Sequence, residues 1–278
     1  MEYIIKQLLF DDGDVSLQKV VDLENLVYQG KHNYTVDFFK RWYIENPMGR
    51  VVSFNAFCED ELVAHYACVP IRMNIKGGIS LGLLDIFTVT HPEHRGRGLF
   101  RQLAQASYDY AKNQGFEFVI GVANANSFPG YMKYFQFSFI SRLEVKMGCG
   151  TNIVPDGEKD FSVFWDKEGM NWRLNCGKAN YSRNSNSILG QYNSFVQTYM
   201  GSFSEDLLSS SNVRNKGWLW RPRLYVGLGA RFNSRYFKIP KFIKHSPFNL
   251  IFLDLTGGKL PKMTKDNVFF QLFDFDVA

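Results

Sequence analysis

The chain has 278 residues, of which 45% are hydrophobic and 16% aromatic, and it carries a formal net charge of +5. This composition supports packed cores and excludes a disordered chain, while the length favours two modest domains over a single large one. No apolar run approaches the ~20 residues of a membrane helix and no signal peptide begins the chain, so we expect a soluble cytoplasmic protein without a membrane span.

The expected elements follow from hydrophobic periodicity and from glycine, proline and capping residues. Strands are expected over residues 3–10, 51–57, 62–69, 80–89, 118–123 and 137–147. Helices are expected over about 17–26, 36–43, 98–113 and 129–135. The helix at 98–113 has apolar side chains at i, i+3/i+4 spacing, and Gly115 supplies its C-terminal stop. Together these elements predict an α/β unit with a mixed sheet and helices on both faces.

Glycine and polar residues between 148 and 157 mark the best position for a domain boundary. This position divides the chain into residues 1–150 and 151–278. In the second part, residues 170–174 stand before two expected strands, 188–192 and 195–199, much as residues 39–43 stand before the first hairpin. We therefore expect a degenerate second copy of the same fold, with an unrelated accessory domain as the alternative.

The cysteines show no metal-binding or disulfide pattern. Cys58, Cys68, Cys149 and Cys176 lie too far apart for a Cys-x-x-Cys pair, and no histidine cluster accompanies them. The sequence therefore predicts neither a zinc site nor a disulfide framework, and a reducing cytoplasm fits best.

The most informative stretch runs from Asp85 to Gly115 and joins an expected strand to an expected helix through the loop Arg95-Gly96-Arg97-Gly98-Leu99-Phe100. Its two glycines let the backbone bend so that several N–H groups converge at a helix N-terminus, which favours a phosphate. A dinucleotide fingerprint is excluded because its third small residue is Arg101 here. A nucleoside-triphosphate loop is excluded because no Gly-Lys-Ser/Thr follows.

This loop resembles motif A of the GCN5-related N-acetyltransferases (GNAT family), whose pattern is Gln/Arg-x-x-Gly-x-Gly/Ala between a strand and a helix. Arg95 and Gly98 match the pattern, whereas Phe100 stands where glycine or alanine is usual. The run from Asn124 to Tyr131 is similar to the segment that leads into the helix beside the pantetheine arm. Its Asn-x-Asn-Ser-aromatic-Pro-Gly pattern resembles a branch associated with amino sugars of bacterial surface polysaccharides.

The resemblance covers roughly residues 50–145 and implies a GNAT fold, with a central mixed, mostly antiparallel sheet flanked by helices. The second part is then a degenerate GNAT-like α/β domain, because residues 201–206 have no glycine pair where the phosphate loop should lie. Acetyl-coenzyme A is the implied co-substrate, and no metal is predicted. The implied cofactor-binding residues are the backbone of Thr88, Val89 and Thr90, the loop residues Arg95, Gly96, Arg97, Gly98, Leu99 and Phe100, and the side chains of Asn124 and Asn126. Capping of the following helix is the alternative for both asparagines.

Acetyl transfer to an amine requires a neutral nucleophile, a polarised thioester carbonyl and a proton for the departing thiolate. Asp85 is our choice of general base over His65 and His91, because a carboxylate within an apolar strand is costly to bury unless it is paired or useful. Tying a neighbouring loop, or binding the substrate amine, is the alternative for Asp85. At the position where the family usually has a tyrosine that acts as general acid, this sequence has Met132. The proton donor is therefore expected to be Tyr134 or Tyr131.

Residues 207–253 contain no acidic residue but hold nine basic ones, and an anionic partner is one interpretation. The basic residues are Arg214, Lys216, Arg221, Arg223, Arg231, Arg235, Lys238, Lys241 and Lys244. A solvated face is the alternative. Recognition of acceptor phosphates is favoured over nucleic acid, because the charges are scattered among strands and prolines.

The sequence thus predicts an N-acetyltransferase that moves acetyl from acetyl-coenzyme A to a primary amine by direct attack in a ternary complex. An amino sugar, including a nucleotide-linked or other phosphate-bearing one, is the expected small-molecule acceptor. The alternative is a non-catalytic protein of the same fold that holds an anionic polymer or glycan through its basic second half. The sequence leaves both a monomer and a homodimer open.

Overall fold

The computed structural model describes residues 2–10, 13–151, 153–176, 181–209, 213, 221–232, 235–239 and 246–275. Its helices are α1 Val15–Val27, α2 Val36–Tyr43, α3 Leu99–Asn113, α4 Phe128–Tyr134, α5 Lys167–Cys176 and α6 Glu205–Ser209, with short 3₁₀ turns η1 Pro92–His94 and η2 Leu272–Asp274. The strands are β1 Ile4–Gln7, β2 Val52–Cys58, β3 Glu61–Ile75, β4 Gly78–Thr90, β5 Phe118–Ala123, β6 Ser138–Arg142, β7 Glu144–Gly148, β8 Ile153–Pro155, β9 Phe161–Val163, β10 Ser182–Asn184, β11 Ser187–Gln191, β12 Gln197–Ser202, β13 Arg223–Leu228, β14 Ala230–Phe232, β15 Tyr236–Lys238, β16 Asn249–Asp254 and β17 Val268–Gln271.

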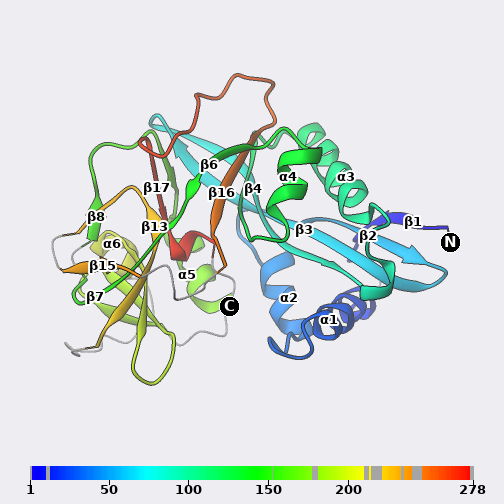
Figure 1. The fold of residues 1–278 in the computed structure, drawn as a ribbon, viewed down its shortest axis with the longest axis horizontal. Helices are drawn as coiled ribbons and strands as arrows, with labels where there is room; N and C mark the ends of the chain where they lie inside the picture. Colours follow the sequence, from blue (N-terminus) through cyan, green and yellow to red (C-terminus); the bar gives the residue numbers. More distant parts are fainter. Residues whose placement is uncertain are drawn as a thin grey trace.

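The first part of the chain forms a mixed sheet covered by helices on both faces, which confirms the predicted fold class. The strands run in the order β1-β2-β3-β4-β5-β16-β6, and β4–β5 is the parallel pair in this series. Helices α3 and α4 lie over one face, while α1 and α2 lie over the other (Figure 1). We call these the α3 face and the α2 face.

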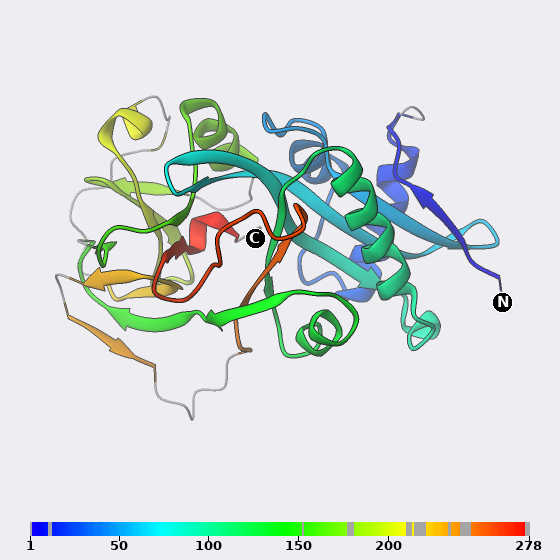
Figure 2. The same ribbon diagram turned by 90° about the horizontal axis from the view of Figure 1, so that it is seen from above.

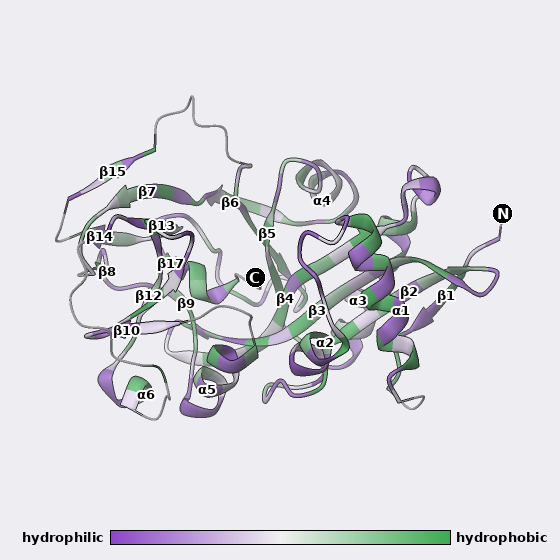
Figure 3. Ribbon diagram, turned by 90° about the horizontal axis from the view of Figure 1, so that it is seen from below, coloured by the Kyte–Doolittle hydropathy of each residue, from purple (hydrophilic) through white to green (hydrophobic). Residues whose placement is uncertain are grey.

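The two faces enclose two cores, because side chains alternate across each central strand. The core on the α3 face includes Leu103 and Ala111 of α3, which follow the predicted helical spacing. The larger core on the α2 face continues into the second part of the chain and reaches Phe273. Hydrophobic residues accordingly gather on the central strands and on the inward sides of the helices (Figure 3).

Strands cross the expected boundary near residue 150 in both directions. The strand β16 lies between β5 and β6 and pairs with both, while β7 pairs with β13 of the second part. The single strand expected over 137–147 is therefore two strands, and Figure 2 shows them as one green ribbon running from the first part into the second. The division into residues 1–150 and 151–278 stays a prediction, because one continuous hydrogen-bonded sheet crosses this position.

The second part repeats the predicted order of a helix followed by a hairpin. Helix α5 precedes β11 and β12, which pair antiparallel. Of the nine basic residues in the acid-free stretch, Arg214, Lys216, Lys241 and Lys244 lie outside the described residues. Arg223 is buried within β13, so the stretch is not a uniformly solvated face. Within the described residues, no helix is both long and apolar enough to span a membrane.

Candidate active site

The central feature of the site is the point where β4 and β5 part. These strands pair only from Leu83 to Asp85, and Asp85 lies opposite Gly121. They approach closely there, because a Cβ on Gly121 would lie 3.2 Å from the Cβ of Asp85. Strand β4 continues to Thr90, and among the described residues no strand pairs with 86–90 on the β5 side. One edge of this segment is therefore left open for another chain of amide groups, as in β-strand addition.

A β-bulge in β4 sets the direction of the side chains at this point. Phe87 pairs with Ala67 whereas Asp85 pairs with Cys68, so Ile86 is the extra residue. The bulge reverses the alternation. As a result Asp85 contacts residues of the α3 face, while Phe87 is buried in the core of the α2 face.

Thr88 lies opposite Tyr66 in the β3–β4 ladder, on the open segment. Its hydroxyl is buried and has no hydrogen-bond partner among the described residues. A buried hydroxyl without a partner is costly, so this atom marks a place for a ligand group. The neighbouring Val89 is 4% exposed and packs in the core, and the Thr90 carbonyl accepts a hydrogen bond from Arg95 Nε at 3.2 Å.

The predicted phosphate loop has the expected geometry. Gly96 and Gly98 have φ angles of 75° and 76°, the left-handed region that glycine adopts at little cost. Helix α3 begins at Leu99, and Gln102 is the first residue of this helix whose N–H reaches a preceding carbonyl, that of Gly98 at 3.2 Å. Within the described residues, the N–H groups of 96–101 donate to no other group of the protein. A run of free N–H groups at a helix N-terminus fits a diphosphate.

Phe100, which departs from the family pattern, packs between α3 and α4. Its ring centroid lies 5.2 Å from that of Tyr131 in an edge-on contact. A Cβ on Gly130 would come within 2.9 Å of the Phe100 ring. Phe100 and Gly130 therefore complement each other, and the large side chain at the motif position helps to hold α4 beside the site.

Three tyrosine hydroxyls surround the Asp85 carboxylate. Tyr66 of β3 donates a hydrogen bond to Asp85 Oδ2, and Tyr108 of α3 donates to the same oxygen at 3.3 Å. The hydroxyls of Tyr66 and Tyr108 also bond to each other. Tyr131 faces the same carboxylate from α4 and favours its charged form. Asp85 and Tyr131 were predicted from the sequence, whereas Tyr66 and Tyr108 were not.

Burial is the dominant electrostatic effect in this cluster. It raises the pKa of Asp85 to about 6, although the three tyrosine hydroxyls act to lower it. Burial, with the nearby Asp85 charge as a smaller cause, also raises the pKa of Tyr66, Tyr108 and Tyr131 well above 10. At neutral pH the carboxylate is thus mostly ionised and accepts hydrogen bonds from neutral phenols. Its near-neutral pKa suits a general base.

The structure places the remaining predicted residues around this cluster or apart from it. Tyr134 is 42% exposed and lies under the Arg101 guanidinium, 5.5 Å from its ring centroid, so it does not join the Asp85 cluster. Asn124 Oδ1 accepts the N–H groups of Asn126 and Ser127 at 2.9 and 3.0 Å in the turn before α4, whose N-cap is Ser127. The side chain of Asn126 is exposed at the same turn.

The two histidines considered as bases occupy structural positions. His65 is fully buried on the α2 face, between the Tyr43 hydroxyl at 2.8 Å and Asn55 Oδ1 at 2.7 Å. Burial lowers the pKa of His65 to about 3. The backbone N–H of His91 bonds the Val63 carbonyl, and the His91 ring accepts the Glu93 N–H at the start of η1. Among the described residues, no group of His, Cys, Asp or Glu side chains is arranged to hold a metal ion.

The fold and the site define an acyltransferase. Residues 13–137 match the sequence family described as the acetyltransferase (GNAT) domain. Enzymes of this family take the acetyl group from acetyl-coenzyme A. No curated protein sequence matches the chain significantly.

Solved structures extend the likeness over most of the chain. A conserved protein of unknown function from Enterococcus faecalis V583 aligns with a TM-score of 0.60 and 9% identity, over 92% of this chain and 73% of that one. A GCN5-related N-acetyltransferase from Kribbella flavida gives 0.57 and 9% over the same shares. A fungal glucosamine N-acetyltransferase region within a multi-domain β-N-acetylglucosaminidase gives 0.50 and 9%, over 91% of this chain and 38% of that one. At such identities the likeness shows the fold alone.

Proposed function

We propose that the protein is an N-acetyltransferase that transfers acetyl from acetyl-coenzyme A to a primary amine of an amino sugar. The observation that carries the proposal is the parting of β4 and β5 at Asp85, with free loop amides at the end of the same strand. Acetyl-coenzyme A would supply the activated thioester carbonyl. The loop amides of 96–101 would hold its diphosphate, and the open edge of 86–90 with the Thr88 hydroxyl would bind the amide groups of its arm.

The catalytic roles follow from the charge states in the cluster. Asp85 takes the proton from the amine as the new N–C bond forms, directly or through a water. Tyr66 and Tyr108 position the carboxylate by donating to Oδ2. A phenol whose pKa is raised far above the ~8.5 of a thiol gives up its proton reluctantly. Tyr131 therefore serves as the hydrogen-bond donor to the departing sulfur, and the geometry favours it over the exposed Tyr134.

The acceptor class rests on two similarities. The Asn124–Gly130 run resembles the branch associated with amino sugars, and the fungal region with the same fold is a glucosamine N-acetyltransferase. Turnover with a panel of amines, followed by release of free thiol, tests this part. Turnover of an amino sugar supports the proposal. Tight coenzyme binding without turnover of any amine supports the non-catalytic alternative.

Coenzyme binding is tested by calorimetric titration of coenzyme A into wild-type protein and into Gly98→Ala. The control is Gly115→Ala at the other end of α3, because Gly115 has a similar φ of 83° and an added Cβ there meets nothing within 4 Å. Both substitutions strain the backbone by about 1 kcal/mol. We expect Gly98→Ala alone to weaken binding, by about tenfold or more. Equal affinities for the two variants, or no heat with the wild type, would refute the loop assignment.

A further inference from the structure

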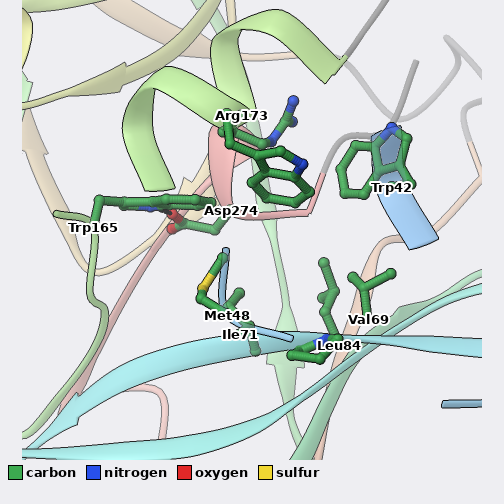
Figure 4. A pocket seen from close by; sticks show the side chains of 10 residues that line it. Trp42, Met48, Val69, Ile71, Leu84, Trp165, Arg173 and Asp274 are labelled. Atoms are coloured by element: carbon green, nitrogen blue, oxygen red, sulfur yellow. Dashed lines mark hydrogen bonds between the residues drawn. The ribbon is translucent and has the colours of Figure 1, made fainter. Parts of the chain in front are cut away.

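Arginine side chains that lie on aromatic rings occupy two opposite settings in this structure. The first is the joint between the two parts of the chain, where the Arg173 guanidinium of α5 lies 5.2 Å from the Trp42 ring (Figure 4). Arg173 is 1% exposed, and its Nε donates to the Phe273 carbonyl at 3.1 Å. The space left at this joint is about 10 Å³, enough for no more than one water molecule. Arg173 is therefore a packing residue, and this joint has no room for a ligand.

The second setting is the surface beside the predicted phosphate loop. Arg101 lies in the first turn of α3, and its guanidinium is 5.5 Å from the centroid of the Tyr134 ring. The Lys133 ammonium lies 5.2 Å from the same centroid. All three residues are exposed. Two cations thus lie at one ring, and within the described residues neither of them forms a hydrogen bond or an ion pair.

The place of these cations is set by the packing of α4 against α3. Phe100, the residue before Arg101, has ring-centroid distances of 5.2 Å to Tyr131 and 5.8 Å to Phe135. These rings belong to the core of the α3 face or pack against it. Because Tyr134 directly precedes Phe135, the same contacts hold the Tyr134 ring beside Arg101. The surface that carries the two cations is therefore defined by the aromatic core beneath it.

The segments around the two cations carry no opposite charge. Residues 94–108, which span the loop and the first half of α3, contain no aspartate or glutamate, and neither do residues 118–143, which span β5, α4 and β6. Glu93, just before the loop, pairs with neither cation. Like charges held close together repel each other, so a bound anion would stabilise this arrangement. A phosphate suits it, because a guanidinium and an ammonium offer several charged N–H donors to its oxygens.

We propose that Arg101 and Lys133 bind the 3′-phosphate of coenzyme A and so distinguish this coenzyme from its 3′-dephospho form. The inference rests on the proposed function, because it takes the coenzyme diphosphate to lie at the amides of 96–101. Coenzyme A carries both phosphate groups on one ribose, the diphosphate at the 5′ position and the monophosphate at the 3′ position. Arg101 belongs to the same turn as the free amides, so the monophosphate of that ribose meets the two cations. Tyr134 holds these cations and takes no part in proton transfer.

The test is calorimetric titration of coenzyme A and of 3′-dephospho-coenzyme A into wild type, Arg101→Gln, Lys133→Gln and the double variant. The control is Lys112→Gln, which removes an exposed cation from the last turn of the same helix. We expect wild type and control to bind coenzyme A about tenfold more tightly than the dephospho form, and each single variant to keep about a threefold preference. The double variant should bind both ligands equally. Affinity for the dephospho form should be the same in all five proteins.

The outcomes separate this inference from the proposed function. Equal affinities of the wild type for the two ligands would overturn the inference, as would a preference that survives in the double variant or is lost in Lys112→Gln. Preferential binding of coenzyme A without turnover of any amine would support the inference and count against the proposed transfer alone. No heat with either ligand would refute the loop assignment and this inference with it.

Discussion

Replacing Asp85 by asparagine should separate its chemistry from its structural role. The variant keeps an oxygen that can accept from Tyr66 and Tyr108, so the hydrogen-bonded cluster and the fold should persist. It cannot accept a proton. Loss of a positioned general base lowers the rate about 10²- to 10⁴-fold, so we expect kcat to fall by this amount while coenzyme affinity changes little.

The pH dependence gives the sharper measurement. Burial raises the pKa of Asp85 to about 6, so the fraction ionised is roughly 90% at pH 7 and roughly 10% at pH 5. Activity of the wild type should therefore fall about tenfold between these values, since the base works only when ionised. The rate of thiol release with saturating acetyl-coenzyme A measures this activity. Asp85→Asn should show a low rate that does not fall further between pH 7 and pH 5; we call this fall the acid limb.

Asp109→Asn supplies the control, because Asp109 is an exposed carboxylate on α3 that accepts a hydrogen bond from Gln105. It should retain both the rate and the acid limb. An unchanged rate and pH profile in Asp85→Asn would remove Asp85 from the catalytic role and leave it as a structural partner of the tyrosines.

Two further predictions concern groups that titrate inside the protein. In Tyr108→Phe, Asp85 loses a hydrogen-bond donor that lowers its pKa, so the loss of activity at low pH should begin at a higher pH, by up to about one pH unit. The control Tyr110→Phe, on the same helix, should leave the pH profile in place. An unchanged pH profile in Tyr108→Phe would contradict the positioning role of Tyr108. Glu24 of α1 is 1% exposed, and its carboxylate has no hydrogen-bond partner among the described residues. Burial raises the pKa of this carboxyl from 4.5 to about 8. Between these values the folded state holds more protons than the unfolded state, so the free energy of unfolding falls as pH rises, by about 2 kcal/mol from pH 6 to pH 8. Urea unfolding at both pH values should show this fall in the wild type and in Asp22→Asn, an exposed acid on the same helix, and not in Glu24→Gln; parallel losses in wild type and Glu24→Gln would refute it.

The parts of the site that depend on local sequence could be predicted, and those that depend on strand register could not. The loop and the start of α3 could be predicted because both signals are local in the sequence. Gly96 and Gly98 permit a left-handed backbone, and the residues that follow have the apolar spacing of a helix. Tyr66 and Tyr108 lie 42 residues apart in the chain, and their meeting depends on how β3 pairs with β4. The bulge at Ile86, which turns Asp85 toward them, has no local signal in an apolar β-branched segment.

A sequence signal for the tyrosine cluster does exist. Tyr66 lies on the same face of β3 as Ala64 and Cys68, and Tyr108 lies on the buried side of α3 with Ala104 and Ala111. Both tyrosines thus lie on buried faces, where a phenolic hydroxyl needs a partner. Asp85 is the acid within the neighbouring expected strand, so pairing the buried hydroxyls with the buried carboxylate would have found the cluster.

The exchange of strands between the two parts explains how the open edge of β4 is maintained. Beyond Asp85, strand β5 has lost β4 as a partner, and an unpaired strand would be free to close the gap or to fray. The strand β16 pairs with β5 along its whole length, from Phe118 to Ala123. Its other edge is held in turn by β6. β5 is therefore held on the edge away from β4 by a strand more than a hundred residues further along the chain, so the geometry around Asp85 depends on the second part of the chain even where that part contributes no side chain to the site.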